Sequence, residues 1–333
     1  MRVTLLHSAD ALEPPPDPVL EQLTSTLTSL SHEVTTVAAD EDIIPVAHAL
    51  RTTQPDIVFN LIESFAGVSS LDSNVTALLN LLGLRYTGSS PSGLLLAGDK
   101  SLTKQVLGFH GIKSPEFATL YRGAVEWAGH LQFPVIVKPP QEDASIGITN
   151  RSVVHDLKEL FGRIDDLHTE FQQPVLVEEF VDGREFYVGV LGNLHPEALP
   201  VIELDFSKFP AHMPRVASWE AKWGTDGTGT EAEAQKSKEF AGTQSIFPAD
   251  LDEQLTERMQ QTAMRAFEAL RLRDYARIDL RVTNEGEIFV IEVNPNCYLE
   301  QNAEFARAAE RHGLSYEALI GRILELANAR YAR

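Results

Sequence analysis

The chain has 333 residues, 43% of them hydrophobic and 23% charged, a composition typical of globular proteins with two or three compact units. It carries 28 Lys and Arg against 48 Asp and Glu, and the resulting charge of -20 opposes nonspecific binding to nucleic acid or to an anionic membrane. Any polyphosphate that it binds must therefore be held by a few locally placed cations.

The single cysteine, Cys297, excludes an internal disulfide framework, and no histidine lies at a zinc-ligand spacing from it. The first residues, MRVTLLHSADALEPPPDPVL, turn acidic and proline-rich soon after an apolar run, so they lack the hydrophobic region of a signal peptide. No apolar run approaches the ~20 residues that span a bilayer. These features predict a cytoplasmic protein without nucleic-acid or membrane partners.

The first 93 residues alternate predicted strands with predicted helices. Strands are expected at 2–7, 33–39 and 56–63, and helices near 20–30, 42–53 and 72–82. This order predicts a doubly wound parallel sheet with ligands beyond the carboxyl ends of its strands, and Glu63 lies at one of these ends. The turn-rich segment LRYTGSSPSG (84–93) marks the first domain boundary.

Two further units are expected, at 94–174 and at 175–333. Their predicted elements are helices near 98–110, 153–163 and 250–271, a strand in FPVIVKPP (133–140), two strands around Gly183 and a final helix capped by Ser315. The glycine-rich, charged segment 205–245 lacks periodicity, which is typical of a lid or binding loop. A surface excursion without such a role is the alternative.

The segment DLRVTNEGEIFVIEVNPN (279–296) predicts a β-hairpin. If its loop has an even number of residues, the pairs on one face are apolar: Ile278 with Val293, Leu280 with Ile291 and Val282 with Phe289. The other face then sets Asp279 opposite Glu292. A three-residue loop would mix the two faces, so the even loop is predicted.

Asp279 and Glu292, directly opposed, would destabilise the hairpin unless a cation offsets their repulsion. Mg²⁺ prefers oxygen ligands, and Asn294 on the same face offers another. Arg277 adds donors for an anion. The alternative is a solvated face on which Arg277 and Arg281 simply neutralise Asp279.

Several other groups could bind phosphate. Lys138 ends an apolar strand and is placed to contact phosphate as a point charge, although a solvated strand end is the alternative. Lys100 and Lys104 lie one helical turn apart, for which an exposed helix face is the alternative. The segment QEDASIG lacks the spacing of a P-loop, and no G-x-G-x-x-G follows the first strand. Backbone amides near Ser145 and Gly147 can still approach phosphate, unless the segment is a plain turn.

Taken together, these segments resemble the ATP-grasp superfamily, most closely its D-alanine–D-alanine ligase-like branch. The matching segments are DK (99–100), PVIVKP (134–139), LVEEFVDGREF (176–186), EAKW (220–223), ARIDLRV (276–282) and IEVNPN (291–296), in the family's order. The resemblance covers essentially the whole chain. It implies an α/β ATP-grasp fold: an N-terminal doubly wound domain, a small central domain and a C-terminal domain with an antiparallel sheet.

The resemblance also implies roles for individual residues. ATP would lie between two sheets, its phosphates near Lys100 and Lys138, its γ-phosphate near Lys222, its adenine near Glu178, Glu179, Phe180 and Val181, and its ribose near Glu185. The candidate catalytic residues are Arg277, Lys222 and Ser145. Asp279, Glu292 and Asn294 would hold Mg²⁺ or Mn²⁺, and Arg277 would stabilise the reacting centre. Such enzymes phosphorylate a carboxylate to an acyl phosphate, which an amine attacks to give an amide, ADP and phosphate. The segment 205–245 would close over the site.

The sequence departs from the family where the substrates bind. The dipeptide ligases carry a Ser-Pro-Gly-type turn after the metal asparagine, whereas this chain reads NPNCYLEQNAEF. Where those ligases have paired serines this chain has Ala144 and Ser145, and the acidic residue that grips an ammonium group has only Glu13 and Glu63 as candidates. Candidate substrate residues are Glu63, Trp223 in place of a tyrosine, Asn296 and Tyr298.

These departures predict a ligase of amino acids or peptides that is not a true D-Ala–D-Ala ligase, and the family suggests a homodimer. The alternatives are another ATP-grasp chemistry, such as carboxylation or nucleotide-precursor ligation, and a noncatalytic nucleotide-binding protein.

Overall fold

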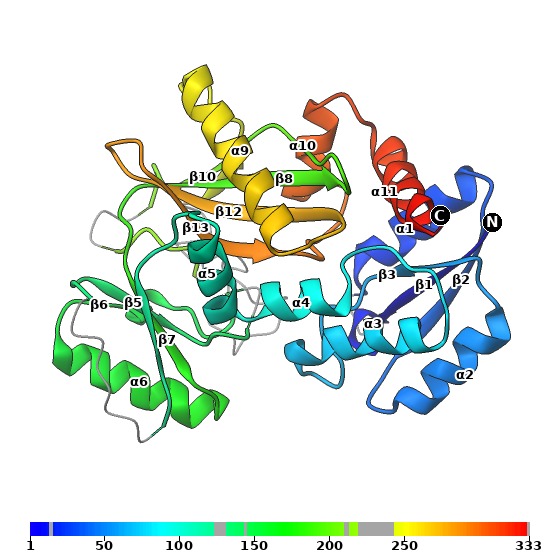
Figure 1. The fold of residues 1–333 in the computed structure, drawn as a ribbon, viewed down its shortest axis with the longest axis horizontal. Helices are drawn as coiled ribbons and strands as arrows, with labels where there is room; N and C mark the ends of the chain where they lie inside the picture. The colour runs from blue at the N-terminus through cyan, green and yellow to red at the C-terminus, as the bar shows by residue number, and fades with distance from the viewer. Residues whose placement is uncertain (13–15, 123–130, 143–144, 210–212, 219–242, 332–333) are drawn as a thin grey trace.

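The computed structural model describes residues 1–12, 16–122, 131–142, 145–209, 213–218 and 243–331. Three sheets organise this part of the chain. Figure 1 shows a parallel sheet near the N-terminus, a small sheet below a long antiparallel one, and the helix α4 crossing between these parts.

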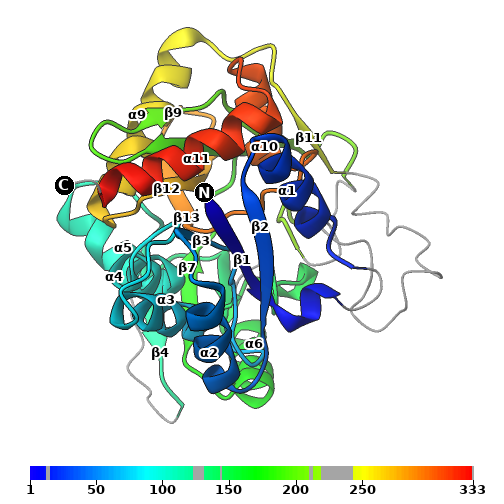
Figure 2. The same cartoon turned by 90° about the vertical axis from the view of Figure 1, so that its right-hand side faces the viewer.

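The N-terminal sheet is parallel, in the order β2-β1-β3. Its strands are β1 (Arg2–Ser8), β2 (Glu33–Ala39) and β3 (Ile57–Asn60). Side chains alternate between the two faces: Leu5 and Phe59 pack with α1 (Pro18–Ser29) and α11 (Tyr316–Arg330), whereas Leu6 and Val58 pack with α2 (Ile43–Thr53) and α3 (Asp72–Leu81). Figure 2 shows α11 beside α1 above the strands. The predicted doubly wound sheet is confirmed, with one covering helix from the far end of the chain.

The predicted boundary segment 84–93 is only partly a turn. Tyr86 forms a parallel bridge with Val58 at the edge of the N-terminal sheet. Ser90 then caps the unpredicted helix α4 (Pro91–Gly98), because its side chain accepts a hydrogen bond from Gly93 and proline is favoured at the first helical position. The helix α5 (Lys100–Phe109) follows at once, capped by Asp99.

The central sheet has the order β4-β7-β5-β6 and carries α6 (Leu157–Phe171) on one face. Its strands are β4 (Phe117–Leu120), β5 (Val135–Lys138), β6 (Val153–Val154) and β7 (Val175–Glu179). The predicted start of a helix at 153 is wrong: β6 comes first, and Asp156 caps α6. Because β7 lies past residue 174, sheet membership alone would extend the central unit to 179; the division of the chain into domains stays a prediction.

The C-terminal sheet is antiparallel, in the order β11-β10-β8-β12-β13 with β9 beside β8. Its strands are β8 (Arg184–Gly192), β9 (Glu197–Ala198), β10 (Ile202–Asp205), β11 (Gln244–Ile246), β12 (Asp274–Val282) and β13 (Ile288–Asn294). One face packs on α9 (Glu253–Ala269), and the other on α10 (Glu304–Arg311) and α11. Short 3-10 helices lie at Ala9–Leu12, Ser69–Leu71 and Asn150–Ser152.

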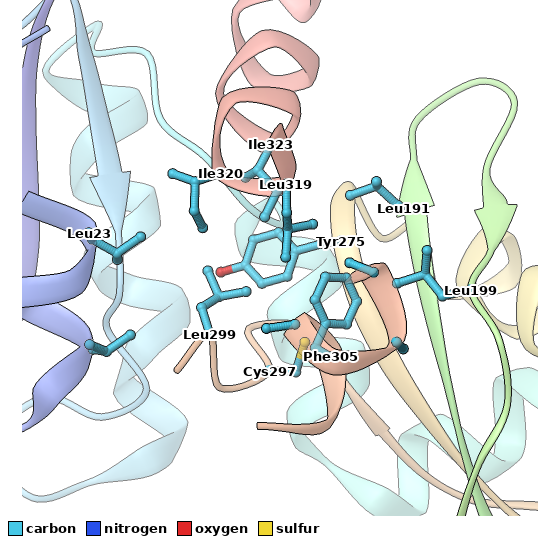
Figure 3. Packing of buried hydrophobic residues seen from close by; sticks show 14 of the residues in the cluster. Leu23, Leu191, Leu199, Tyr275, Cys297, Leu299, Phe305, Leu319, Ile320 and Ile323 are labelled. Atoms are coloured by element: carbon cyan, nitrogen blue, oxygen red, sulfur yellow. The ribbon is translucent and has the colours of Figure 1, made fainter. Parts of the chain in front are cut away.

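A single hydrophobic cluster joins the N-terminal sheet to the C-terminal sheet. Figure 3 shows the ring of Tyr275, from β12, between Leu319 of α11 and the ring of Phe305. Leu23 of α1 belongs to the same cluster. Since such a core is close-packed, the two units are held in a fixed relation at this point.

A buried polar seam accompanies this cluster. The side chain of Asp274, which is fully buried, accepts hydrogen bonds from the backbone amide of Gly88 (2.8 Å) and from Asn193 (3.0 Å), and it pairs with Arg330 at 3.2 Å. Arg330 in turn donates to the carbonyl of Gly88. Gly88 has a φ of +86°, and a Cβ there would lie 2.9 Å from Oδ1 of Asn296. The seam therefore requires glycine at this position.

At its open end the hairpin of β12 and β13 has the predicted pairs of Ile278 with Val293 and of Asp279 with Glu292, and Arg277 pairs with Asn294 beside them. Beyond these pairs the register shifts by one residue, so that Leu280 faces Val290 and Val282 faces Ile288. The predicted pairs of Leu280 with Ile291 and of Val282 with Phe289 are therefore wrong.

The predicted loop with an even number of residues is wrong. The amide of Thr283 donates to the carbonyl of Glu287 at 3.0 Å, which encloses a three-residue turn. A bulge that leaves Ile291 unpaired compensates for the odd loop, so the buried residues still face one side. None of the described helices is long and apolar enough to cross a membrane.

Candidate active site

A cleft between the central and C-terminal sheets brings together most of the predicted site residues, and we call it the inter-sheet cleft. Its lining includes Lys138, Ser145, Glu178, Glu179, Phe180, Val181, Glu185, Asp279, Arg281, Ile291 and Glu292. The predicted residues Lys100 and Arg277 reach it through ion pairs with Glu292 and Asp279.

Glu178, on β7, is the most deeply buried acid of the cleft, with 1% of its surface exposed. Its Oε1 lies 3.0 Å from Nζ of Lys138 and 3.3 Å from Nζ of Lys104. Burial alone would raise the pKa of Glu178, but the two ammonium groups outweigh it and hold the pKa below its usual value. Both Lys138 and Lys104 are buried. This excludes a solvated strand end for Lys138 and an exposed helix face for Lys104.

Lys100 is the first residue of α5 and is also buried. Its Nζ lies 2.9 Å from Oε1 of Glu292 and donates to the backbone carbonyl of Glu142. A predicted phosphate ligand thus contacts a predicted metal ligand directly. This ion pair brings the N-terminus of α5 next to the hairpin of β12 and β13.

One face of β12 presents Arg277, Asp279 and Arg281 in alternation. Arg277 donates to both carboxylate oxygens of Asp279, at 2.7 and 2.9 Å. Arg281 instead pairs with Glu185 at 2.8 Å, and its guanidinium group lies over the ring of Phe180. Asp279 and Arg281 are 2% and 4% exposed, so the alternative of a solvated face is wrong, although Arg277 does neutralise Asp279.

The edge predicted to receive adenine is partly engaged within the chain. The amide of Phe180 donates to the carbonyl of Pro134 at 2.9 Å, and the carbonyl of Val181 accepts from Arg281. The carboxylate of Glu179 accepts from the amide of Gln132. These bonds hold in place the segment 179–181, which lines the cleft.

Ser145 connects the predicted phosphate loop to part of the predicted lid. Its hydroxyl donates to the carbonyl of Ala217 at 2.6 Å, and it adopts the left-handed conformation with a φ of +66°. Val216 and Ala217 line the cleft. Asp205 of β10 pairs with Gln244 of β11, so the two ends of the segment between them lie side by side. Lys222 and Trp223 lie outside the described residues.

A second pocket lies between the carboxyl ends of the N-terminal strands and the chain after β13, and we call it the N-terminal pocket. It is lined by His7, Ser8, Ala11, Asp17, Val19, Leu20, Leu61, Glu63, Ser64, Tyr275, Asn296, Cys297, Tyr298 and Leu299. Three predicted substrate residues, Glu63, Asn296 and Tyr298, therefore meet here. The hydroxyl of Tyr298 donates to Asp17 at 2.8 Å, and Asn296 donates to the carbonyl of Ile62. Glu13 lies outside the described residues.

The two pockets are connected by β12. Tyr275 lines the N-terminal pocket and Asp279 lines the inter-sheet cleft. Together with Arg277 they are every second residue of β12 and lie on one face of the strand. From Tyr275 to Asp279 the strand rises about 13 Å, at about 3.3 Å for each residue. Arg277 therefore stands between the two pockets.

The relatives of this chain identify its family. The model described as D-ala D-ala ligase C-terminus matches residues 106–325. A D-alanine–D-alanine ligase of Syntrophotalea carbinolica is 32% identical over 309 residues, which cover 92% of this chain and 90% of that protein. The chain belongs to the D-alanine–D-alanine ligase family. The predicted ATP-grasp branch, an ATP-dependent ligase forming C–N bonds, is thereby confirmed at the level of the family.

Two further relatives extend this picture of the D-alanine–D-alanine ligase family. An uncharacterized protein of Sinorhizobium fredii is 32% identical over 327 residues, covering 95% of this chain and 91% of that protein. The structure of the D-alanine–D-alanine ligase of Bacillus anthracis complexed with ATP has a TM-score of 0.77 at 21% identity. Because it covers 99% of this chain and 98% of that chain, it supports the predicted fold along the full length.

The predicted metal ligands of this family member form a suitable donor set. Asp279 and Glu292 are directly opposed, and Asn294 follows on the same face of β13. All three side chains carry the oxygen atoms that Mg²⁺ prefers. The buried Nδ2 of Asn294 has no hydrogen-bond partner, so turning the amide to present its oxygen breaks no such bond. Within the described ranges, no group of three or more His, Cys, Asp and Glu could hold a metal, so the amide is essential to this assignment.

Sequence reasoning missed three features of this ligase-family site. Arg281 was considered only as a neighbour of Asp279, and its pairing with Glu185 depends on β12 lying against β8. Tyr187 donates to Glu185 and lies under the guanidinium group of Arg277. Asp17 could have been found, because an aspartate before Pro18 is a typical helix N-cap.

Proposed function

We propose that the protein is an ATP-dependent carboxylate–amine ligase that joins amino acids or peptides through an acyl phosphate. The inter-sheet cleft would bind ATP, and the N-terminal pocket would bind a substrate. The observation that carries this proposal is the single face of β12, on which Arg277 stands between the lining residues Tyr275 and Asp279. A phosphoryl donor and its acceptor can meet at such a point.

The charges of the cleft suit ATP despite the acidity of the chain. The cations Lys100, Lys138 and Arg281 are buried beside carboxylates rather than spread over the surface. Phosphoryl transfer depends mainly on positioning and charge neutralisation, so fixed cations suit it. Mg²⁺ held by Asp279, Glu292 and Asn294 would neutralise the phosphate charge.

The reaction can be written with its atoms balanced. A carboxylate oxygen of the first substrate attacks the γ-phosphorus, and ADP leaves. The amine of the second substrate attacks the acyl carbon, phosphate leaves, and the amine gives up a proton. Arg277 would hold the oxygens that carry the developing negative charge, since its guanidinium offers several donors in fixed geometry.

The N-terminal pocket favours a substrate with an ammonium group and an apolar side chain. Asp17 and Glu63 supply negative charge, whereas Leu20, Leu61 and Leu299 supply apolar walls. The segment after Asn294 lacks the Ser-Pro-Gly-type turn of the dipeptide ligases. We therefore propose that the protein is not a true D-Ala–D-Ala ligase.

The decisive experiment measures phosphate release from ATP and Mg²⁺ in the presence of pooled amino acids and small acids, followed by product masses. The expected product exceeds one substrate mass by the second substrate minus water. Robust formation of D-Ala–D-Ala alone would overturn the substrate proposal, and bicarbonate-dependent phosphate release would favour carboxylation. Release that does not depend on added substrates serves as the blank.

The proposal also keeps the three domains of 1–93, 94–174 and 175–333, a homodimer and a cytoplasmic location as expectations. Light scattering during gel filtration tests the dimer, for which a single peak at the mass of one chain would be the contrary result.

A further inference from the structure

Lys104 is a buried cation that does not belong to the lining of the inter-sheet cleft. It lies one turn after Lys100 on α5, and 3% of its surface is exposed. Lys138 lines the cleft, whereas Lys104 lines a neighbouring groove that shares Glu179, Phe180 and Val181 with the cleft. The two lysines therefore line different pockets, although both contact Glu178.

Both lysines contact the same oxygen atom. Nζ of Lys138 and Nζ of Lys104 lie 3.0 and 3.3 Å from Oε1 of Glu178. Counting Lys104, Lys138 and Glu178 as ionised, the group carries two positive charges and one negative charge. A single lysine would therefore be enough to neutralise Glu178, and the second is in excess.

A buried carboxylate that loses its counter-ion is strongly destabilised, because the charge then remains in a medium of low polarity. If Lys138 were the only counter-ion of Glu178, it could turn to a phosphate only at this cost. With Lys104 in place, Glu178 keeps a partner when the ammonium group of Lys138 moves.

We propose that Lys104 is a positioning residue, the permanent counter-ion of Glu178 that allows Lys138 to contact the phosphates of ATP. This assignment rests on the proposed ATP site. Lys104 itself touches no phosphate. When Lys104 is removed, Lys138 remains as the partner of Glu178, which the resemblance places near the adenine. The effect on nucleotide binding therefore concerns mainly the phosphates.

The ionisation of the group agrees with this role. Burial lowers the pKa of Lys104 to about 8, and Glu178 opposes this shift. Lys104 therefore remains mainly protonated at neutral pH. The pKa of Glu178 stays below its usual value, so its carboxylate remains ionised.

The test compares MgATP with adenosine, which lacks phosphates, by titration calorimetry on the full chain. Lys104→Met is expected to weaken MgATP binding about tenfold, which corresponds to about 1.4 kcal/mol, and to change adenosine binding less than about twofold. In a Lys138→Met background that also carries Glu178→Gln, so that no buried carboxylate is left without a counter-ion, Lys104→Met should add less than about a twofold loss. Lys113→Met is the matched control, because Lys113 is an exposed lysine paired with Glu287, and it should leave both affinities unchanged.

Three results would overturn the assignment: unchanged MgATP affinity, an equal loss for MgATP and adenosine, or an undiminished loss in the background of Lys138→Met with Glu178→Gln. Equal loss would indicate a merely structural lysine. Failure of the wild-type chain to bind MgATP would instead contradict the proposed nucleotide site itself.

A second variant covers the case in which Lys104→Met does not fold. Lys104→Met combined with Glu178→Gln removes both charges, so no buried carboxylate is left unpaired. Its ratio of MgATP to adenosine affinity should match that of Glu178→Gln alone. A ratio about tenfold lower would show that Lys104 acts without Glu178, contrary to the proposal.

Discussion

The inter-sheet cleft and the N-terminal pocket differ in how their charges are arranged. In the cleft, each buried acid has a cation of the chain within 3.3 Å, as for Glu178 with Lys104 and for Glu185 with Arg281. No lysine or arginine lines the described N-terminal pocket, where Asp17 and Glu63 face apolar walls. The cleft also carries most of the motifs shared with the ligase family, whereas the pocket contains the segment after Asn294 and the candidate acid Glu63, where the chain departs from them. The common reaction is therefore expected in the cleft, and the choice of substrate in the pocket.

The largest effect is expected from the carboxylates of the hairpin. Asp279→Asn or Glu292→Gln should lower phosphate release by about a thousandfold, since losing several kcal/mol of charge stabilisation costs a factor of ten for each 1.36 kcal/mol. Circular dichroism should show an unchanged fold. Glu287→Gln, in the turn of the same hairpin and paired with exposed Lys113, is the control and should retain wild-type turnover. Wild-type turnover by Asp279→Asn would remove Asp279 from the metal site.

A smaller effect is expected in the N-terminal pocket, and it separates the two regions. Asp17→Asn or Glu63→Gln should lower kcat/KM for an amine-bearing substrate about ten- to a hundredfold, because each removes a charged partner worth about 1.5–3 kcal/mol. The KM for ATP should not change. Tyr298→Phe keeps the ring and loses only the hydroxyl that contacts Asp17, so its effect should be weaker. A parallel rise in the KM for ATP would contradict the division of roles.

The smallest effect on turnover is expected at the buried seam of Gly88, Asn193, Asp274 and Arg330, where the titration of Asp274 changes stability instead. Burial raises the pKa of Asp274 to about 6, although Arg330 opposes the shift. The folded state therefore holds a proton that the unfolded chain releases above the usual aspartate pKa of 3.8, and stability falls as pH rises from about 4 to about 6. The loss is about 3 kcal/mol, or several degrees in Tm.

The pH dependence of Tm tests this sign. Asp274→Asn should flatten the curve between about pH 4 and pH 7, because its side chain cannot titrate. The wild-type Tm should fall across the same interval. A wild-type Tm that rises between pH 5 and pH 7, with a variant that follows it, would show that Asp274 is ionised throughout.

Local patterns predicted the elements that are determined locally. Alternating strands and helices were sufficient for the N-terminal sheet, and Ser315 caps α11 as expected, accepting from the amide of Ala318. The pairing of Asp279 with Glu292 followed from keeping one face apolar. The helix α4 was missed because SSPSG was interpreted as a turn, although Ser90 before Pro91 is also a helix start.

Partners from distant strands could not be predicted in this way. The pairing of Arg281 with Glu185 arises from the register of β12 against β8, and the contacts of Lys104 arise where α5 meets β7. Neither spacing appears in a local window of sequence. The N-terminal pocket combines Asp17 with Tyr298 over 281 positions, which only the assembled fold specifies.

The bulge at Ile291 allows the hairpin to keep its strand pairs and also to place one more side chain in the inter-sheet cleft. Every other residue of β13 has a partner on β12, whereas Ile291 has none and lines the inter-sheet cleft beside Glu292. Deleting Ile291 would leave the turn and the opposed carboxylates with the partners they already have. The hairpin could therefore lose Ile291 without losing a strand pair. Ile291 is thus a position at which a substitution can change the lining of the inter-sheet cleft without changing the pairing of the sheet.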